Sequence, residues 1–261
     1  MSSRLTAIEA LAADPAASGL VLDFDGVLSP IVEDPTASAM PDRVAAVLTR
    51  LARPLGLLAV MSGRPAEFLA DRVRVAGVPL IGSYGLEQIW DGKRRIDPDA
   101  EQWLGPVREA ARDLRDRLAT SPGIRVEEKP VSVAVHWRQA PDRAAAADQV
   151  RQVTARIATE TGLRLEPGKL VEELRPPLDV DKGSAILALL ATRKMATIAY
   201  AGDDLGDVPA LRAVREAGGY ALVVDHGSET DPRLLDLADQ TYAGTEGFAA
   251  WLAELAEVIG A

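Results

Sequence analysis

Short apolar runs that end abruptly in polar residues recur near both ends of the chain. Such runs are typical of strands in a parallel sheet, because helices cover both faces of that kind of sheet. They lie at residues 19–22, 55–61, 78–81, 197–201 and 220–224. Segments with helical patterns alternate with them, at residues 4–13, 41–52, 182–193 and 208–217. The alternation predicts an α/β fold with a doubly wound parallel sheet and a ligand site at the carboxyl ends of its strands.

The middle of the chain has a different pattern. A helical stretch with many charges lies at 100–119 and a second helical stretch at 141–161, and extended stretches lie at 124–138, 163–166 and 169–175. Strands clustered around two helices indicate an α+β insert rather than more of the parallel sheet. We therefore predict a core domain of residues 1–104 and 179–261, interrupted by a cap domain of residues 105–178.

Composition and charge narrow the classes of protein that fit. Apolar residues make up 48% of the chain and charged residues 26%, a balance typical of folded globular domains. The formal charge of −10 disfavours nucleic acid and anionic membranes as partners. No apolar run approaches the roughly 18 residues that span a membrane, and the N-terminus lacks a signal-peptide pattern. Without cysteine there is no disulfide, thiolate nucleophile or zinc–thiolate site, which fits the cytoplasmic location that we expect.

Two carboxylates follow the first predicted strand, at Asp23 and Asp25, and Gly26 allows a sharp turn after them. With this spacing one carboxylate can attack phosphorus, while the other protonates the leaving oxygen and later activates water. Asp-x-Asp-Gly also occurs as an ordinary turn or helix cap, so the segment by itself leaves both interpretations open.

A second acidic loop, with Asp203, Asp204 and Asp207, follows the strand predicted at 197–201. Five carboxylates at two strand ends would repel one another unless a cation lay between them, and hard oxygen ligands favour Mg²⁺. Asp203 or Asp204 can also cap the following helix, but caps alone do not explain the clustering.

Groups that can bind a phosphate follow other predicted strands. Ser62 precedes a helix start, whose backbone amides attract anions, and Lys182 with Gly183 opens a later helix. Each of these short segments is a weak signal. Their order along the chain, together with the two acidic loops, predicts metal-assisted phosphoryl transfer.

This order of motifs resembles the haloacid dehalogenase superfamily of phosphotransferases. The resemblance implies that Asp23 is a nucleophile that forms an aspartyl-phosphate, and that Asp25 is the general acid and base. It also implies that Ser62 and Lys182 bind the phosphate. The Mg²⁺ ligands and supporting acids that it implies are Asp23, Asp25 through its carbonyl, Asp203, Asp204 and Asp207.

Further segments resemble one family of that superfamily, the trehalose-6-phosphate phosphatases. The matching segments are Ser62-Gly63-Arg64, Gly82-Ser83-Tyr84-Gly85-Leu86-Glu87, Glu127-Glu128-Lys129, His136-Trp137-Arg138 and residues 168–176. The resemblance implies hydrolysis of a small sugar phosphate, trehalose 6-phosphate, in trehalose biosynthesis. It also makes a trehalose-phosphate synthase of the same pathway a candidate partner.

The resemblance assigns substrate contacts as well. The substrate-binding residues that it implies are Arg64, Glu87, Glu127, Lys129, Arg138, Lys169 and Glu173. Glu127, Lys129 and Glu173 would bind sugar hydroxyls, which need donors and acceptors rather than an apolar pocket. Arg138 and Lys169 would add positive charge near the phosphate entrance. From composition alone, the same side chains form an exposed charged face of the cap.

Three places depart from the family pattern. Tyr84 replaces the usual histidine, and Trp137 replaces a tyrosine. Gly206 and Val208 replace a threonine and a glutamate, but the remaining acids lead us to expect that metal binding persists. The alternatives are a phosphatase for another sugar phosphate, of the sucrose or mannosylglycerate type, and a catalytically weak sugar-phosphate sensor on the same fold.

Overall fold

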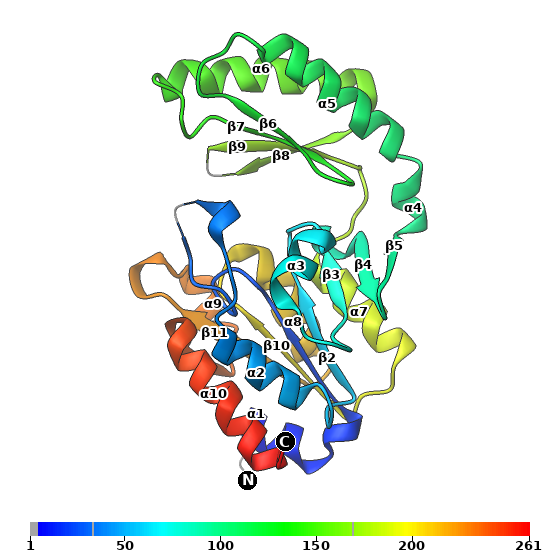
Figure 1. Cartoon of the computed structure of the whole chain (residues 1–261), viewed down its shortest axis with the longest axis vertical. Coiled ribbons are helices and arrows are strands. Elements are labelled where there is room, and N and C mark those ends of the chain that lie inside the picture. The colour runs from blue at the N-terminus through cyan, green and yellow to red at the C-terminus, as the bar shows by residue number, and fades with distance from the viewer. Residues whose placement is uncertain (1–4, 33, 169) are drawn as a thin grey trace. The chain divides into compact units, whose positions relative to one another are not determined.

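The computed structural model describes residues 5–32, 34–168 and 170–261, which belong to two compact units (Figure 1). The core unit comprises Met1–Arg95 and Val180–Ala261, and the insert unit comprises Ile96–Asp179. The segment predicted as a cap, residues 105–178, lies inside the insert unit, which also includes the short helix α4 (Pro98–Glu101).

The core unit is built on an eight-stranded sheet in the order β12-β11-β10-β1-β2-β3-β4-β5. Its parallel strands are β1 (Ser18–Leu22), β2 (Leu57–Met61), β3 (Leu80–Gly82), β10 (Thr197–Gly202), β11 (Tyr220–Asp225) and β12 (Gln240–Ala243). β4 (Glu87–Trp90) pairs antiparallel with β3, and β5 (Lys93–Ile96) forms the edge. The predicted parallel sheet is therefore present, with an antiparallel extension that the apolar runs do not indicate.

Successive side chains of a strand point to opposite faces of the sheet, and here both sets are apolar and enter two different clusters. Helices therefore cover both faces. In β1, Leu20 and Leu22 pack on one face and Val21 packs on the other. The first face is covered by α1 (Ala7–Ala13), α2 (Asp42–Leu51), α3 (Ala66–Val73) and α10 (Gly244–Ile259). The second is covered by α7 (Lys182–Thr192), α8 (Val208–Glu216) and α9 (Pro232–Leu235). This is the doubly wound arrangement that the sequence predicts (Figure 1).

The insert unit packs two helices on one face of a four-stranded sheet in the order β6-β7-β9-β8 (Figure 1). Its elements are α5 (Leu104–Leu118), β6 (Arg125–Glu128), β7 (Val133–His136), α6 (Arg143–Thr161), β8 (Arg164–Gly168) and β9 (Val171–Arg175). Val133, Val135 and Leu174 enter an apolar core with residues of both helices, such as Leu114 and Val150. The other face of the sheet is left to the alternate side chains.

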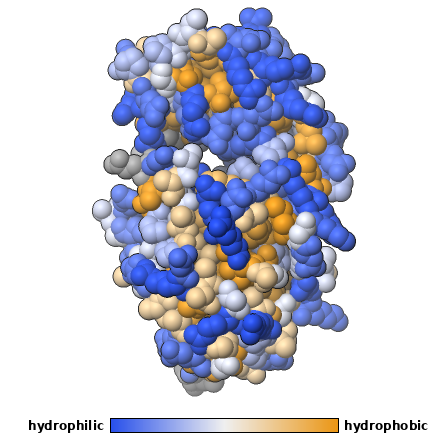
Figure 2. Space-filling model, viewed as in Figure 1, coloured by the Kyte–Doolittle hydropathy of each residue, from blue (hydrophilic) through white to orange (hydrophobic). Residues whose placement is uncertain are grey.

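Short 3₁₀ turns complete the two units, at Pro15–Ala17, Pro35–Ala37, Ser83–Gly85, Leu205–Asp207 and Gly227–Glu229. Figure 2 shows polar side chains over much of the visible surface of each unit, interrupted by apolar patches. Within the described residues, no helix is both long enough and apolar enough to cross a membrane.

Candidate active site

Predicted catalytic residues follow the carboxyl ends of three neighbouring strands of the core sheet. Asp23 follows β1, Ser62 follows β2 and Asp203 follows β10, and β1 lies between the other two strands. The backbone amide of Asp23 donates to the carbonyl oxygen of Ala201 at 2.9 Å, so the pairing of β1 with β10 continues to the acidic residue. Residues far apart in the sequence thus meet at the carboxyl ends of parallel strands.

Lys182, the first residue of α7, places a buried cation at this edge. Its Nζ donates to Asp23 Oδ1 and to Asp207 Oδ1, each at 2.6 Å. The side chain of Asp181 accepts from the amide of Ser184, and this cap sets where the helix, and therefore Lys182, begins. Burial by itself disfavours the ammonium form, but the two carboxylates outweigh burial and raise the pKa of Lys182 well above its usual value.

Asp207 holds several parts of the site together. Its Oδ1 accepts from Lys182 and from the hydroxyl group of Tyr200, which lies 2.5 Å away. Its Oδ2 accepts from the amides of Asp203 and Asp204 at 2.9 and 3.1 Å. Burial alone would raise the pKa of Asp207, but the charge and hydrogen bond of Lys182 outweigh it and lower the pKa. Tyr200 is not among the predicted site residues, and its signal in the sequence is a hydroxyl group within the apolar run at 198–201.

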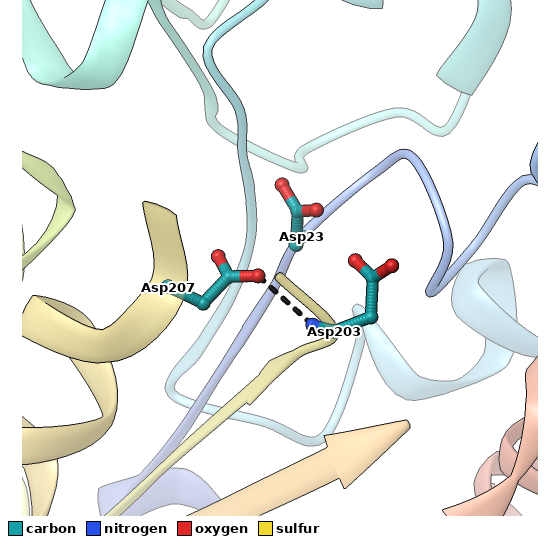
Figure 3. A group of neighbouring side chains, drawn as sticks. All are labelled: Asp23, Asp203 and Asp207. Atoms are coloured by element: carbon teal, nitrogen blue, oxygen red, sulfur yellow. Dashed lines mark hydrogen bonds between the residues drawn. The ribbon is translucent and has the colours of Figure 1, made fainter. Parts of the chain in front are cut away.

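Asp23, Asp203 and Asp207 converge as a candidate cation site (Figure 3). Each offers one carboxylate oxygen, and these oxygens lie within 4.8 Å of one another. Burial, followed by the charges of Asp207 and Asp204, raises the pKa of Asp203 to about 8. Burial likewise raises the pKa of Asp23, although Lys182 opposes it. Crowded, desolvated oxygen ligands of this kind fit a hard divalent cation such as Mg²⁺.

Asp203 and Asp204 have different surroundings. Gly26 adopts a φ of +78°, and a Cβ there would lie 2.0 Å from Asp203 Oδ2. His226 Nε2 lies 3.6 Å from the same oxygen and 2.9 Å from the carbonyl oxygen of Gly26. Asp204 is exposed, and its Oδ1 accepts from the amide of Gly206 at 2.8 Å as a helix cap. Of these two acids, Asp203 is therefore the one enclosed beside Asp23.

Asp25 is held by two side chains that donate to its carboxylate. Arg64 Nε donates to Oδ2 at 2.8 Å, and a terminal nitrogen of Arg64 donates to Oδ1 at 3.2 Å. The hydroxyl group of Ser38 donates to Oδ1 at 2.7 Å. Ser62 Oγ accepts from the amide of Arg64 at 3.2 Å, which leaves the Ser62 proton available for an oxygen of a bound phosphate. Arg64, predicted to bind substrate, thus contacts the predicted general acid and base.

Glu87, also predicted to bind substrate, is completely buried. Its Oε1 accepts from the hydroxyl group of Ser83 at 2.5 Å, and its Oε2 accepts from Arg94 at 3.0 Å. Ser83 and Tyr84 have φ angles of 49° and 60°, a left-handed conformation that is uncommon outside glycine. A Cβ on Gly63 would lie 2.6 Å from the ring of Tyr84. Glu87 therefore supports a strained turn whose tyrosine packs against the loop after β2.

Four polar side chains gather on the face of the insert sheet opposite its apolar core. Glu127 and Glu173 flank Ala134 in register on neighbouring strands. His136 Nε2 lies 2.8 Å from Glu127, and this hydrogen bond is the main cause that lowers the pKa of Glu127 to about 2. Lys129 Nζ donates to Glu173 at 2.9 Å. We call Glu127, Lys129, His136 and Glu173 the insert cluster.

Arg138 and Lys169 are the other residues of the insert segment that the sequence predicts to bind substrate. Arg138 is exposed and lines a shallow pocket with Arg125 and His136. Lys169 lies outside the described residues.

Comparisons with known proteins find relatives in sequence and in fold. A family model described as trehalose-phosphatase matches residues 21–236. The trehalose-phosphate phosphatase of Mycolicibacterium paratuberculosis is 38% identical over 220 residues, which cover 80% of this chain and 55% of the relative. The chain thus spans about half the length of the curated relatives that it matches.

Solved structures share the fold. A trehalose-6-phosphate phosphatase related protein superposes with a TM-score of 0.78 at 24% identity, over 92% of this chain and 97% of that one. A haloacid dehalogenase-like hydrolase from Bacteroides thetaiotaomicron gives 0.64 at 16% identity, over 91% and 99%. Because the family model matches most of the sequence and the fold agrees with it, the chain belongs to the trehalose-phosphatase family.

Proposed function

We propose that this chain hydrolyses trehalose 6-phosphate to trehalose and phosphate, with Mg²⁺ and an aspartyl-phosphate intermediate on Asp23. The observation that carries the proposal is the contact of buried Lys182 with Asp23 at 2.6 Å, beside the enclosed carboxylate of Asp203. A nucleophile, a fixed cation and candidate metal ligands therefore meet at adjacent strand ends.

The contacts of each residue suggest its part in the reaction. Lys182 occupies Oδ1 of Asp23, which leaves Oδ2 to attack phosphorus. As the new Asp23–phosphorus bond forms, the bond from phosphorus to the sugar oxygen breaks, and Asp25 gives its proton to that oxygen. A water molecule then attacks phosphorus and loses a proton to Asp25. The bond between Asp23 and phosphorus breaks, which releases phosphate and restores the carboxylate of Asp23.

The negative charge of the phosphate needs hydrogen-bond donors and positive charges around it. Ser62 supplies a hydroxyl group, the backbone at the start of α3 supplies amides, and Lys182 supplies a positive charge. Mg²⁺ held by Asp23, Asp203 and the carbonyl oxygen of Asp25 would neutralise phosphate oxygens as a Lewis acid. Asp207, whose oxygens are both occupied, is better suited to hold Lys182 than to bind the ion directly.

We assign substrate selection to the insert unit, as a cap domain of residues 105–178, and catalysis to a core domain of residues 1–104 and 179–261. The insert cluster offers carboxylate acceptors and an ammonium donor on one sheet face, a combination that matches sugar hydroxyls. A trehalose-phosphate synthase of the same pathway would supply the substrate. A sensor on this fold has no need of the complete set of Asp23, Asp25 and Lys182, which favours an enzyme.

Phosphate release from a panel of sugar phosphates, with Mg²⁺ and with EDTA, tests this proposal. We expect hydrolysis of trehalose 6-phosphate in Mg²⁺ to exceed that of sucrose 6-phosphate and glucose 6-phosphate, and EDTA to abolish it. Preference for another sugar phosphate would overturn the substrate assignment. Full activity in EDTA would overturn the metal assignment.

A further inference from the structure

In the loop that follows β1, the buried side chain of Ser38 forms a hydrogen bond with Asp25. Ser38 is 1% exposed, and its Oγ lies 2.7 Å from Asp25 Oδ1 and 2.8 Å from the hydroxyl oxygen of Ser29. A hydroxyl group has one proton, and the proton of Ser38 is directed at Asp25 Oδ1. Ser38 therefore donates to Asp25, and Ser29 donates to Ser38. Hydrogen bonds aligned in one direction polarise and strengthen one another.

The same loop is fixed to α3. Arg72 donates to the carbonyl oxygens of Ser38 and Thr36, each at 3.1 Å, while its guanidinium group lies 3.9 Å from the centre of the Phe68 ring. The guanidinium group of Arg64 lies 4.7 Å from the centre of that ring and holds Asp25. One aromatic side chain thus supports both arginines. The position of Ser38 relative to Asp25 is consequently determined through α3.

We infer that Ser38 is a positioning residue for Asp25, which fixes the rotation of its carboxyl group toward the leaving sugar oxygen. This inference rests on the proposed function. Arg64 also holds Asp25, but its charge attracts the phosphate of an incoming substrate as well. Ser38 is neutral and buried, so its hydrogen bond to Asp25 has no such competitor.

The effect of losing Ser38 depends on the leaving group of the phosphate ester. A sugar oxygen must receive the proton of Asp25 as its bond to phosphorus breaks, since it otherwise leaves as an alkoxide. The p-nitrophenolate ion leaves readily without that proton. Loss of Ser38 should therefore slow phosphoryl transfer from the sugar ester and spare phosphoryl transfer from the aryl ester. Hydrolysis of the aspartyl-phosphate is common to both esters, so the comparison uses kcat/KM, which reports the transfer step.

The test compares kcat/KM for trehalose 6-phosphate and for p-nitrophenyl phosphate, with Mg²⁺, in the native protein and in Ser38→Ala. A general acid contributes about 10²- to 10⁴-fold, and we expect misorientation to remove about tenfold or more with the sugar ester. With the aryl ester, we expect a change of about twofold or less, because its leaving group bypasses the general acid.

Two further variants support the comparison. Ser38→Cys nearly keeps the side-chain volume but has a weak donor, so it should show the same difference between the esters even if alanine disturbs the loop. Thr36→Ala is the matched control, because Thr36 lies in the same loop and bonds Asp34 rather than Asp25. It should leave both values unchanged.

Equal losses with the two esters would overturn the inference, because they would show general damage to the loop or the nucleophile. Unchanged activity with the sugar ester in both Ser38 variants would overturn it as well. A native protein inactive on every sugar phosphate would instead overturn the proposed function, and the inference with it. The two failures are distinguishable, because one is seen in the variants and the other in the native protein.

Discussion

Replacing Asp203 with asparagine tests whether the acidic cluster at the strand ends is built for a cation. The side chain of Asp203 is 9% exposed, and burial together with Asp207 and Asp204 raises its pKa to about 8. Asparagine has nearly the same shape and cannot ionise. In the absence of metal the variant is therefore relieved of a buried charge, whereas in the presence of metal it lacks a ligand.

The magnitude follows from linkage between folding and proton binding. Between its ordinary pKa of 3.8 and the raised pKa of about 8, the folded protein keeps a proton on Asp203 that the unfolded chain has lost. Asp203 thus contributes its full stability below pH 3.8, and that contribution is lost as the pH rises through about 8. At about 1.36 kcal/mol per pKa unit the loss is at most about 6 kcal/mol, and we expect a few kcal/mol.

Urea unfolding measures this effect directly. In EDTA, the contribution of Asp203 to the stability of the native protein should be lost between about pH 3.8 and about pH 8, and Asp203→Asn should lose less stability over that range. Saturating Mg²⁺ should then stabilise the native protein, by about 2.7 kcal/mol at a hundred times the dissociation constant, and leave Asp203→Asn nearly unchanged. Asp204→Asn is the matched control, because asparagine also caps helices well and should keep the response to Mg²⁺.

Two results would refute this reasoning. One is an Asp203→Asn protein that loses as much stability as the native protein over the same pH range in EDTA. The other is a gain from Mg²⁺ in Asp203→Asn that equals the gain in the native protein. Either result would mean that Asp203 carries no unfavourable charge that a cation relieves.

Three other changes give separate tests. Gly26→Ala should lower the free energy of unfolding by at least about 1–2 kcal/mol and abolish stabilisation by Mg²⁺, because its φ is +78° and the new Cβ would meet the carboxylate of Asp203. Urea unfolding measures both effects, and a stabilisation by Mg²⁺ equal to that of the native protein would contradict this. The hydrogen bond from His136 lowers the pKa of Glu127 from 4.5 to about 2, so its stabilisation is present above pH 4.5 and lost as the pH falls through about 2. In acid titrations followed by circular dichroism, Glu127→Gln should flatten that part of the stability curve, and an unchanged curve would count against the pairing. Glu87→Gln should lower the free energy of unfolding by about 1–3 kcal/mol, since it weakens two buried hydrogen bonds, and a neutral effect would show that Glu87 does not support the turn.

Much of the core fold is predictable because its central strands are continuous apolar runs. The runs at 55–61 and 197–201 correspond to β2 and β10, and the acidic or hydroxyl residues that follow them lie at the strand ends. β4 and β5 could not be found in this way, because β4 begins with two polar residues, Glu87 and Gln88, and β5 reads Lys-Arg-Arg-Ile. The final helix α10 is amphipathic, because Phe248, Leu252 and Leu255 recur at helical spacing and are buried.

The candidate site is predictable as a set of residues but not as a set of contacts. Strand order alone brings Asp23 and Asp203 together. By contrast, the contact of Arg64 with Asp25 depends on loop conformation, which apolar periodicity does not specify. The burial of Glu87 depends on Arg94, which lies on a strand that the pattern does not reveal. Sequence motifs therefore predict which residues come together at the strand ends better than they predict the contacts that each side chain makes.

The central claim is that Asp23 receives the phosphoryl group of a sugar phosphate. The most direct measurement is a rapid acid quench of the native protein during turnover of trehalose 6-phosphate with a radiolabelled phosphoryl group. We predict a labelled protein that loses its label to hydroxylamine, as an acyl phosphate does, and no label on Asp23→Asn. Labelled Asp23→Asn, or phosphate release by that variant at the native rate, would contradict the assignment.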